Sequence, residues 1–423
     1  MVITPELVVT GLVFATLTFY VLQVLLYAGA MRRARTLEQP PTPMRPPRVS
    51  ILKPLAGLDD ELRDNLETFA VQRDVDFEIL FGVASEDDPA LEVAQDFVAC
   101  HPEVDARILI TDPDAGLNPK VAQLIGLEDH ARGDIIVISD SNVRVHPDYV
   151  KRLIGELSRP GTAVVSNVIV GTGERSIGSV LENLLLATFQ APGVVAGWEL
   201  SGGGGLAITI GKSMAIWRDV LHRVGGFRDV RNVLAEDQAI GRRCRALGYR
   251  IGLSFDIIQD RNVHGTIWRT LHRHARWAKT RRSIMPAPYL IEPLLLPFVF
   301  ACVGFAVVPT FTTALFVVAT GAAQIAGSQV FMRMLRGHGL TWRQMPLELV
   351  RIWVYFACWL AGWFGNHVRW RGHHLVLGKG AELVATTEEG RAALRVVHEL
   401  EGDEVRDITS APFAGPQSSV TTP

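Results

Sequence analysis

The chain has 423 residues, which is enough for one large domain or two ordinary ones. Its formal net charge of -2 gives no reason to expect a nucleic-acid partner, and its four scattered cysteines show neither a metal-binding spacing nor a disulfide framework. The mean hydropathy of +0.20 is high for a soluble enzyme, because the apolar residues are gathered into long runs that predict membrane segments.

The first apolar run covers residues 7–31, which carry no charge and are followed by arginines between positions 32 and 35. A signal peptide would have a shorter apolar stretch with basic residues before it, so we interpret residues 1–31 as a transmembrane anchor. Basic residues flank the cytoplasmic ends of membrane helices. The arginines therefore predict that the domain after a linker at 32–47 is cytoplasmic.

Residues 48–139 alternate between short apolar runs and amphipathic stretches. Each apolar run is nearly continuous, which is typical of strands buried on both faces of a mostly parallel sheet. Ligands bind such sheets at the carboxyl ends of the strands, where the loops beginning at Lys53, Ser85 and Asp140 are expected. The predicted strands are 48–52, 77–83, 107–110 and 134–139, and the predicted helices are 59–71, 88–99 and 121–131.

After position 161 the predicted strands become shorter. We expect strands at 163–170 and 206–210, with helices at 178–189 and 236–247. This half would complete the acceptor side of one α/β domain that covers residues 48–285.

The C-terminal part begins with an uncharged stretch from Pro293 to Met332, long enough for two spans of roughly 20 residues. We therefore predict a transmembrane helical hairpin at 286–335. Residues 336–378 contain an apolar run with positive charge on both sides and several tryptophans, which favours an interfacial or re-entrant helical region. Residues 379–423 form a tail that we expect to be largely disordered.

Asp140, Ser141 and Asn142 directly follow an apolar strand. A carboxylate at this place can bind a divalent cation that bridges the two phosphates of a nucleotide-sugar and neutralises the leaving diphosphate. The structural alternative is an Asx turn, since Asp and Asn side chains hydrogen-bond their own backbone in loops.

Glu236 and Asp237 precede a predicted helix. Transfer of a sugar with inversion requires one base to take the proton of the attacking hydroxyl, and Asp237 could serve if the helix start directs it into a cleft. The alternative is an acidic pair that only complements the helix dipole.

Arg273, Arg276 and Trp277 lie in a basic helix about fifteen positions before the apolar stretch. Residues three apart share a helical face, and arginines are suited to diphosphate oxygens while an indole can cover a sugar. The alternative is a membrane-proximal helix that binds anionic headgroups.

Two lysine-containing motifs remain. Lys120, after Gly116-Leu-Asn-Pro, could approach the nucleotide or could be an ordinary surface lysine. Gly205 and Gly211-Lys212-Ser213 suggest a phosphate-binding Walker loop, but that motif requires a glycine at position 206, which is leucine. We therefore dismissed it as a nucleotide site.

Taken in order, these segments resemble the ceramide glucosyltransferases, family 21 of the glycosyltransferases and relatives of family 2. The resemblance covers roughly residues 48–375. It is carried by Val49-Ser-Ile-Leu-Lys-Pro-Leu-Ala-Gly, Asn65-Leu-Glu-Thr-Phe, Asp87-Asp88-Pro89, Val104-Asp-Ala-Arg, Gly116-Leu-Asn-Pro-Lys, Asp140-Ser, Arg144-Val, Ala235-Glu-Asp, Arg273-x-x-Arg-Trp and Trp370-Arg371.

The resemblance implies a GT-A fold on the cytosolic membrane face that transfers glucose from UDP-glucose to the primary hydroxyl of ceramide with inversion. It implies that Asp140 serves a divalent cation, Mg²⁺ or Mn²⁺, and that Asp237 is the base. The expected donor and acceptor contacts are Lys53, Asp87, Asp88, Lys120, Glu236, Arg273, Arg276 and Trp277.

The sequence departs from the family pattern at two places. The family's first aspartate falls on Ser85, so Glu86, Asp87 or Asp88 is expected to take over its contact with the nucleotide. Asn142 stands where many family 2 enzymes have a second aspartate, so metal binding would rest on Asp140. These differences bear on the donor sugar more than on the reaction class.

Several other functions were weighed. A hopanoid-directed transferase that uses UDP-glucose or UDP-N-acetylglucosamine is the nearest alternative, followed by a non-catalytic membrane protein that kept the fold. A polysaccharide synthase or a transporter would need more membrane spans. Arginine outnumbers lysine, which favours a bacterial source and an inner-membrane location.

Overall fold

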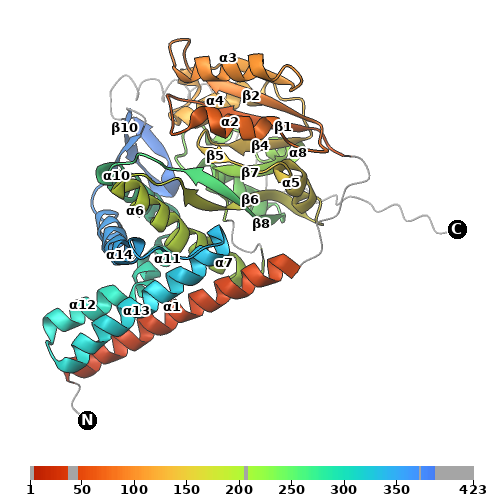
Figure 1. Cartoon of the computed structure of the whole chain (residues 1–423). Coiled ribbons are helices and arrows are strands. Elements are labelled where there is room, and N and C mark those ends of the chain that lie inside the picture. The colour runs from red at the N-terminus through yellow and green to blue at the C-terminus, as the bar shows by residue number, and fades with distance from the viewer. Residues whose placement is uncertain (1–3, 37–45, 204–207, 371–372, 386–423) are drawn as a thin grey trace.

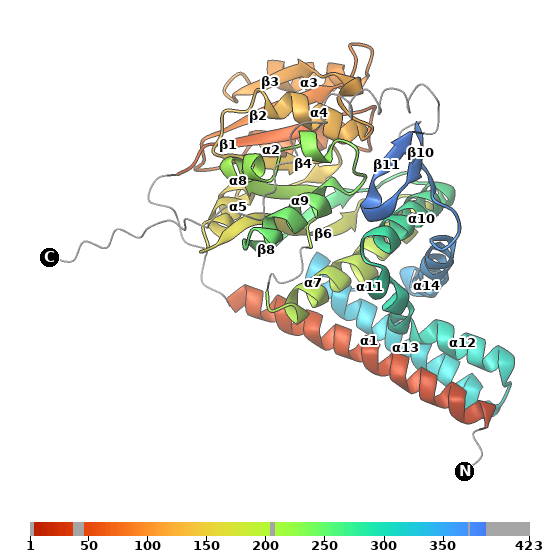
Figure 2. The same cartoon turned by 180° about the vertical axis from the view of Figure 1, so that it is seen from behind.

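An eight-stranded mixed sheet forms the centre of the molecule (Figures 1 and 2). The computed structural model describes residues 4–36, 46–203, 208–370 and 373–385. The strands of this sheet are β1 Val49–Pro54, β2 Phe77–Val83, β3 Ala106–Ile110, β4 Ile135–Ser139, β5 Val143–Arg144, β6 Thr162–Thr172, β7 Ser213–Trp217 and β8 Arg250–Arg261. Their order across the sheet is β3-β2-β1-β4-β7-β6-β8-β5.

Four of the seven strand pairs are parallel: β1 with β2, β1 with β4, β2 with β3, and β6 with β8. The antiparallel strand β7 joins the two halves, pairing with β4 on one side and with β6 on the other. The predicted α/β fold class with a mostly parallel sheet is confirmed, and apolar helices lie in the N-terminal and C-terminal parts of the chain.

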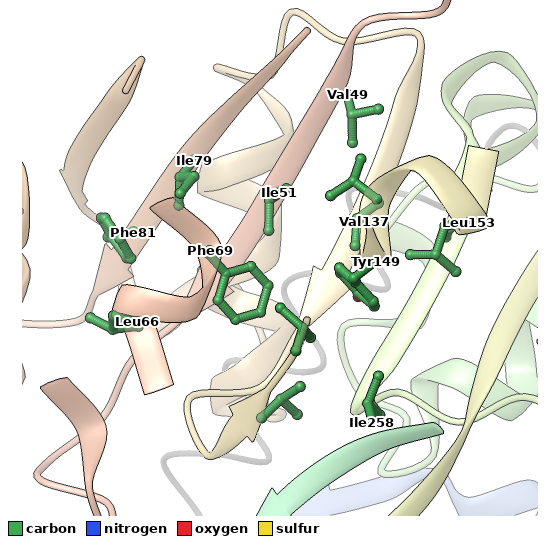
Figure 3. Close-up of a cluster of buried hydrophobic side chains, with 14 of the residues drawn as sticks. Val49, Ile51, Leu66, Phe69, Ile79, Phe81, Val137, Tyr149, Leu153 and Ile258 are labelled. Atoms are coloured by element: carbon green, nitrogen blue, oxygen red, sulfur yellow. The ribbon is translucent and has the colours of Figure 1, made fainter. Parts of the chain in front are cut away.

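Helices cover both faces of the sheet (Figures 1 and 2). On one face lie α2 Leu62–Ala70, α3 Ala90–Cys100 and α5 Tyr149–Leu157, and on the other lie α4 Pro119–Glu128, α8 Arg218–Arg223 and α9 Glu236–Ala246. Successive residues of β1 face opposite sides, so Ile51 belongs to the first core and Leu52 to the second. Figure 3 shows the first core, in which Phe69 and Tyr149 meet edge to face. This double burial explains the continuous apolar runs of the sequence.

Two strands of the second half differ from the prediction. Residues 204–207 lie outside the described part of the chain and 208–210 are not a strand; the strand is β7, which begins at Ser213. The twelve-residue strand β8 was not predicted at all. Its charged and polar residues interrupt the apolar pattern by which a buried strand is recognised in a sequence. It is nevertheless an inner strand of the sheet, because it pairs with β6 on one side and with β5 on the other.

Three helices are long and apolar enough to cross a membrane in the described part of the chain: Pro5–Arg35, Ile177–Leu200 and Phe311–Arg336. The first lies within α1 Pro5–Thr36, which continues past the predicted end at residue 31. Arg33 of α1 forms an ion pair of 2.6 Å with Glu199, so this end of α1 is held against the helix that ends at Leu200.

The region 177–200 consists of α6 Ile177–Leu185, a π-helical segment and α7 Ala191–Leu200. Its most apolar window is 67% buried in protein, against 22% for α1. The sequence predicted a shorter helix at 178–189 and did not place this stretch among the spans. Its burial favours a helix packed between the sheet and the membrane helices, where Figures 1 and 2 show it.

The predicted hairpin at 286–335 is bent. Its first arm consists of α11 Pro286–Ile291, a short 3-10 turn and α12 Pro297–Val307, and the two halves meet at 69°. The second arm is the continuous helix α13 Phe311–Arg336, whose N-terminus is capped by the hydroxyl of Thr310. Helices α12 and α13 pack together with α1 (Figure 2).

The region predicted as interfacial contains α14 Gln344–Ala361, which is not among the candidate spans. Arg351 was read as a charge flanking an apolar run, but it is buried and pairs with Glu348 one turn earlier. Glu348 also accepts hydrogen bonds from Ser328 at 2.7 Å and Thr188 at 3.2 Å. This arginine therefore carries no information on membrane orientation.

The chain after α14 also differs from the prediction. It forms a three-stranded antiparallel sheet of β9 His367–Trp370, β10 His373–Leu377 and β11 Leu383–Ala385. Residues 379–385 were assigned to a disordered tail but are folded, because β11 pairs with β10. The rest of that predicted tail, 386–423, lies outside the described residues.

Candidate active site

Carboxylates from two separate loops meet at one lysine. The Nζ atom of Lys120 lies 2.9 Å from Oδ1 of Asp140 and 3.0 Å from Oε1 of Glu236. It also donates a hydrogen bond of 2.9 Å to the carbonyl of Gly211. The predicted site residues Lys120, Asp140 and Glu236 are therefore brought together. We call the group formed by Lys120, Asp140, Gly211, Lys212, Glu236 and Asp237 the strand-end cluster.

The sequence around Lys120 explains its position. The side chain of Asn118 caps α4 by accepting hydrogen bonds from the backbone of Lys120 and Val121, and Pro119 occupies the first helical position. Gly116 is required because a Cβ atom there would lie 2.7 Å from the backbone oxygen of Arg231. The motif is thus a helix start that projects its lysine toward the end of β4.

Strand pairing brings the loop before β7 to Asp140. Because β7 runs antiparallel to β4, Ser213 lies opposite Ser139, and the backbone N–H of Asp140 donates to the carbonyl of Lys212 at 3.2 Å. A Cβ atom on Gly211 would lie 3.1 Å from both Lys120 and Glu236. Glycine at this position lets the backbone enter the cluster.

Asp237 lies at the N-terminus of α9 and is held by two backbone donors. Its Oδ2 accepts from Gly211 N–H at 2.6 Å and its Oδ1 from Gln238 N–H at 2.7 Å. Burial and the adjacent Glu236 carboxylate raise the pKa of Asp237 to about 7. A carboxylate with such a pKa can accept a proton near neutral pH.

The pKa values of Asp140 and Lys120 move in the opposite sense. Burial by itself would raise the pKa of Asp140, but the ammonium groups of Lys120 and Lys212 outweigh it and hold that pKa well below its usual range. Burial would lower the pKa of Lys120, yet Asp140 and Glu236 raise it. Asp140 and Lys120 therefore remain charged, while Asp237 is left to titrate.

The predicted metal position at Asp140 supplies one carboxylate. Among the described residues, no group of three His, Cys, Asp or Glu side chains is placed to hold a metal ion. Mg²⁺ is commonly bound by one or two carboxylates together with substrate phosphates, and Asp140, with its side chain 26% exposed, fits that requirement. The cation would share Asp140 with the ammonium groups of Lys120 and Lys212.

Two residues of this region were missed by the sequence reasoning. Lys212, which belonged to the dismissed Walker-like motif, places its Nζ 3.0 Å from both Asn142 Oδ1 and Asp260 Oδ1 and 3.6 Å from Asp140 Oδ2. Asp260, at the end of β8, is fully buried. A lysine immediately before an apolar strand was the available signal, because that strand end faces the ligand edge of the sheet.

The arginine motif is connected to the same network through Asp260. Asn262 donates to Asp260 Oδ2 at 3.2 Å and accepts from Arg273 at 3.1 Å. Arg273 lies in α10 Ile267–Ile284, pairs with Glu182 at 3.3 Å and stacks over the ring of Trp277 at 5.0 Å. Arg273 and Trp277 thus act as one unit, joined to the strand-end cluster by side chains.

Arg276 faces a different space. It lines a cavity of about 460 Å³ between α10, α14 and the small sheet β9–β11. The lining is mostly apolar and includes Leu271, Ala275, Ala361 and Leu375. The two arginines, expected to share one contact surface, therefore border two different parts of the molecule.

Lys53, Asp87 and Asp88 lie at the predicted sheet edge but differ in what they contact. Lys53 is fully buried, donates to the carbonyl of Asp140 at 2.9 Å and has its pKa lowered to about 7 by burial. Asp88 accepts from Gly57 N–H at 2.9 Å and from the first turn of α3. Asp87 is exposed to solvent. Lys53 therefore stabilises the Asp140 loop through its backbone carbonyl, and Asp88 stabilises the N-terminus of α3.

Comparison with known proteins identifies the family. The sequence model of glycosyl transferase family 21 matches residues 7–383. The chain belongs to that family. Ceramide glucosyltransferase 1 of Caenorhabditis elegans is 27% identical over 289 residues, which are 68% of this chain and 60% of that protein. The ceramide glucosyltransferase of Komagataella phaffii is 39% identical over 123 residues, 28% of this chain and 24% of that protein.

The chain thus spans about three fifths or less of the length of these family 21 relatives. Among solved structures, the mannosyltransferase PcManGT from Pyrobaculum calidifontis, in complex with GDP-Man and Mn²⁺, superposes with a TM-score of 0.47. It is 17% identical, and the match covers 83% of this chain and 99% of that one. S. aureus TarS in complex with UDP-GlcNAc gives a TM-score of 0.37 at 12% identity, covering 79% of this chain and 98% of that one.

Proposed function

We propose that this family 21 glycosyltransferase transfers glucose from UDP-glucose to the primary hydroxyl of ceramide, with inversion, at the cytoplasmic face of a bacterial inner membrane. The observation that carries the proposal is the convergence of Asp140, Glu236 and Asp237 on Lys120 and Gly211, although they come from separate elements. The curated relatives named as ceramide glucosyltransferases support the choice of lipid.

Asp237 is the proposed base. With a pKa of about 7, roughly half of the Asp237 side chains are ionised at neutral pH and able to accept a proton, and two backbone hydrogen bonds fix the carboxylate against rotation. In the proposed reaction it takes the proton from the acceptor hydroxyl as that oxygen attacks the anomeric carbon and the bond to the diphosphate breaks. A positioned general base contributes roughly 10²- to 10⁴-fold to a rate.

The donor diphosphate is proposed to lie above Lys120 and Lys212. Both ammonium groups are largely buried, with side chains 15% and 12% exposed, and both are held by carboxylates at the end of β4. A divalent cation bound by Asp140 and the phosphates would neutralise charge on the leaving UDP. Arg273 and Trp277 supply a cation and an aromatic face on the acceptor side of the same network.

The cavity between α10 and α14 is proposed to hold an apolar part of the acceptor. Its mostly apolar lining suits a hydrocarbon chain, and Arg276 and Lys279 add polar groups at its wall. Trp268, which also lines it, is 68% exposed and is suited to the membrane interface. A two-tailed lipid can then present its hydroxyl without leaving the bilayer.

The test is lipid glycosylation by the purified chain in nanodiscs, with labelled UDP-glucose and ceramide, followed by mass spectrometry of the lipids. Asp237→Asn should lower the rate roughly 10²- to 10⁴-fold. The control is Asp219→Asn, which changes an acid on α8 that is 61% exposed and paired only along its own helix.

Two results would count against the proposal. Unchanged glycosylation by Asp237→Asn would remove Asp237 as the base. A product formed from bacteriohopanetetrol or from UDP-N-acetylglucosamine, with none from ceramide and UDP-glucose, would reassign the substrates.

A further inference from the structure

The ammonium group of Lys212 is surrounded by oxygens from two other elements. Its ammonium nitrogen lies among three oxygens: Asn142 Oδ1 at 3.0 Å, Asp260 Oδ1 at 3.0 Å and Asp140 Oδ2 at 3.6 Å. The first and third belong to the loop after β4, and the second comes from the end of β8. One side chain therefore joins three strand ends.

The backbone holds this arrangement in place. Strand β5, directly after the 140–142 loop, pairs with β8 so that Val143 lies opposite Asp260. The N–H of Arg261 donates to the carbonyl of Asn142 at 2.8 Å, and Asp140 N–H donates to the carbonyl of Lys212 itself. Because the anchors are backbone pairings on three strands, the ammonium group is a fixed charge and not a mobile surface lysine.

The amide at position 142 fits this role. An aspartate there would add a second carboxylate to the loop and favour a divalent ion, whereas Asn142 supplies only a neutral oxygen that a lysine can donate to. Asp140 and Asp260 each contribute one negative charge near Lys212. The single ammonium group of Lys212 therefore offsets one of these two negative charges and leaves one uncompensated.

Building on the proposed function, we propose that Lys212 is a positioning residue that holds the Asp140 loop on β8 and offsets negative charge of Asp140 and Asp260 that would otherwise repel the donor diphosphate. The nucleotide then binds with a weaker requirement for a divalent cation, because part of the neutralisation is supplied by the protein. Asp140 can still take a cation once the phosphates arrive.

The experiment measures UDP binding to the full chain in nanodiscs by isothermal titration calorimetry, in EDTA and in Mg²⁺. In EDTA, Lys212→Met should bind UDP about tenfold more weakly than wild type, whereas Mg²⁺ should bring the two within about threefold. Lys212→Arg keeps the charge and should stay close to wild type in both buffers. Lys151→Met removes an exposed lysine of α5 and is the control.

Two outcomes overturn the inference. An equal loss of affinity in both buffers would mean that Lys212 only maintains the fold, and an unchanged affinity in EDTA would mean that its charge does not act on the donor. If Lys212→Met does not fold, the isosteric Asp260→Asn removes a negative charge beside Lys212 and should shift UDP binding in EDTA in the opposite direction, toward tighter binding. Failure of wild type to bind UDP in either buffer would instead reject the proposed function.

Discussion

The molecule contains two buried groups of charges that differ in their balance. In the helix bundle, Glu348 faces Arg351, and the two side chains are 0% and 2% exposed. In the strand-end cluster, carboxylates outnumber lysines and Asp140 remains 26% exposed. A closed, balanced pair holds helices together, whereas an open cluster with surplus carboxylates retains groups for a substrate. Asp237 shows this surplus, because its pKa is raised to about 7.

The bundle pair should give the largest effect on stability. Arg351→Met leaves Glu348 buried without its cation, so we expect the free energy of unfolding to fall by about 3–5 kcal/mol. Chemical unfolding in detergent, followed by circular dichroism, measures this loss. Arg343→Met, at an exposed position before α14, should change it by less than about 0.5 kcal/mol. Equal effects of the two variants would show that the pair is not what holds the helices.

The role of the strand-end cluster should instead appear in the pH dependence of the reaction rate. Because the pKa of Asp237 is raised to about 7, the carboxylate is mostly protonated below that pH and cannot act as the base. We expect kcat/KM for the nucleotide-sugar to rise about tenfold per pH unit up to pH near 7 and then to level off. The measurement is initial rates between pH 5 and pH 9, and a rate independent of pH from 5 to 7 would contradict the assignment.

The smallest effect is expected at the cavity beside α10. Ala361→Trp would fill space that we assign to the acceptor, so the KM for the lipid should rise roughly fivefold to tenfold while UDP affinity stays the same. Leu360→Trp, one residue earlier and 41% exposed outside the cavity lining, is the matched control. A loss of UDP affinity in Ala361→Trp would mean that the cavity belongs to the donor side.

The first half of the fold could be predicted from the sequence because its strands are buried on both faces. A continuous apolar run such as Ile135–Ser139 predicts a buried strand from its own residues, without knowledge of its neighbours in the fold. The second half was predicted only in part: β6 and α9 were found, but β8 was not, since it mixes charges with apolar residues and its identity depends on its neighbours β6 and β5. The interpretation of the positive charge before the third apolar run failed at Arg351 for a similar reason, since only the folded bundle shows that Arg351 is buried and paired with Glu348.

The site was predictable where a residue type carries the chemistry. Asp140, Glu236 and Lys120 were selected as single motifs, and the structure brings them into contact. Lys212 was not selected because its motif was compared only with a phosphate-binding loop. Its contacts with Asn142 and Asp260 could not be foreseen, because these partners lie 48 residues or more away in sequence. The prediction that Lys53 contacts the donor stays a prediction; its burial in the sheet depends on packing that no local sequence pattern reports.

Helix α10 has a consequence for which lipids the enzyme can accept. Arg273 joins the network of charged side chains and Arg276 borders the apolar cavity, and three residues of an α-helix advance only about 4.5 Å along its axis. In the proposed function, the sites of sugar transfer and of tail binding would thus be separated by less than one turn of this helix. The helix would therefore fix the distance between the acceptor hydroxyl and the hydrocarbon region. Acceptors would be selected by this short distance and not by the length of their tails.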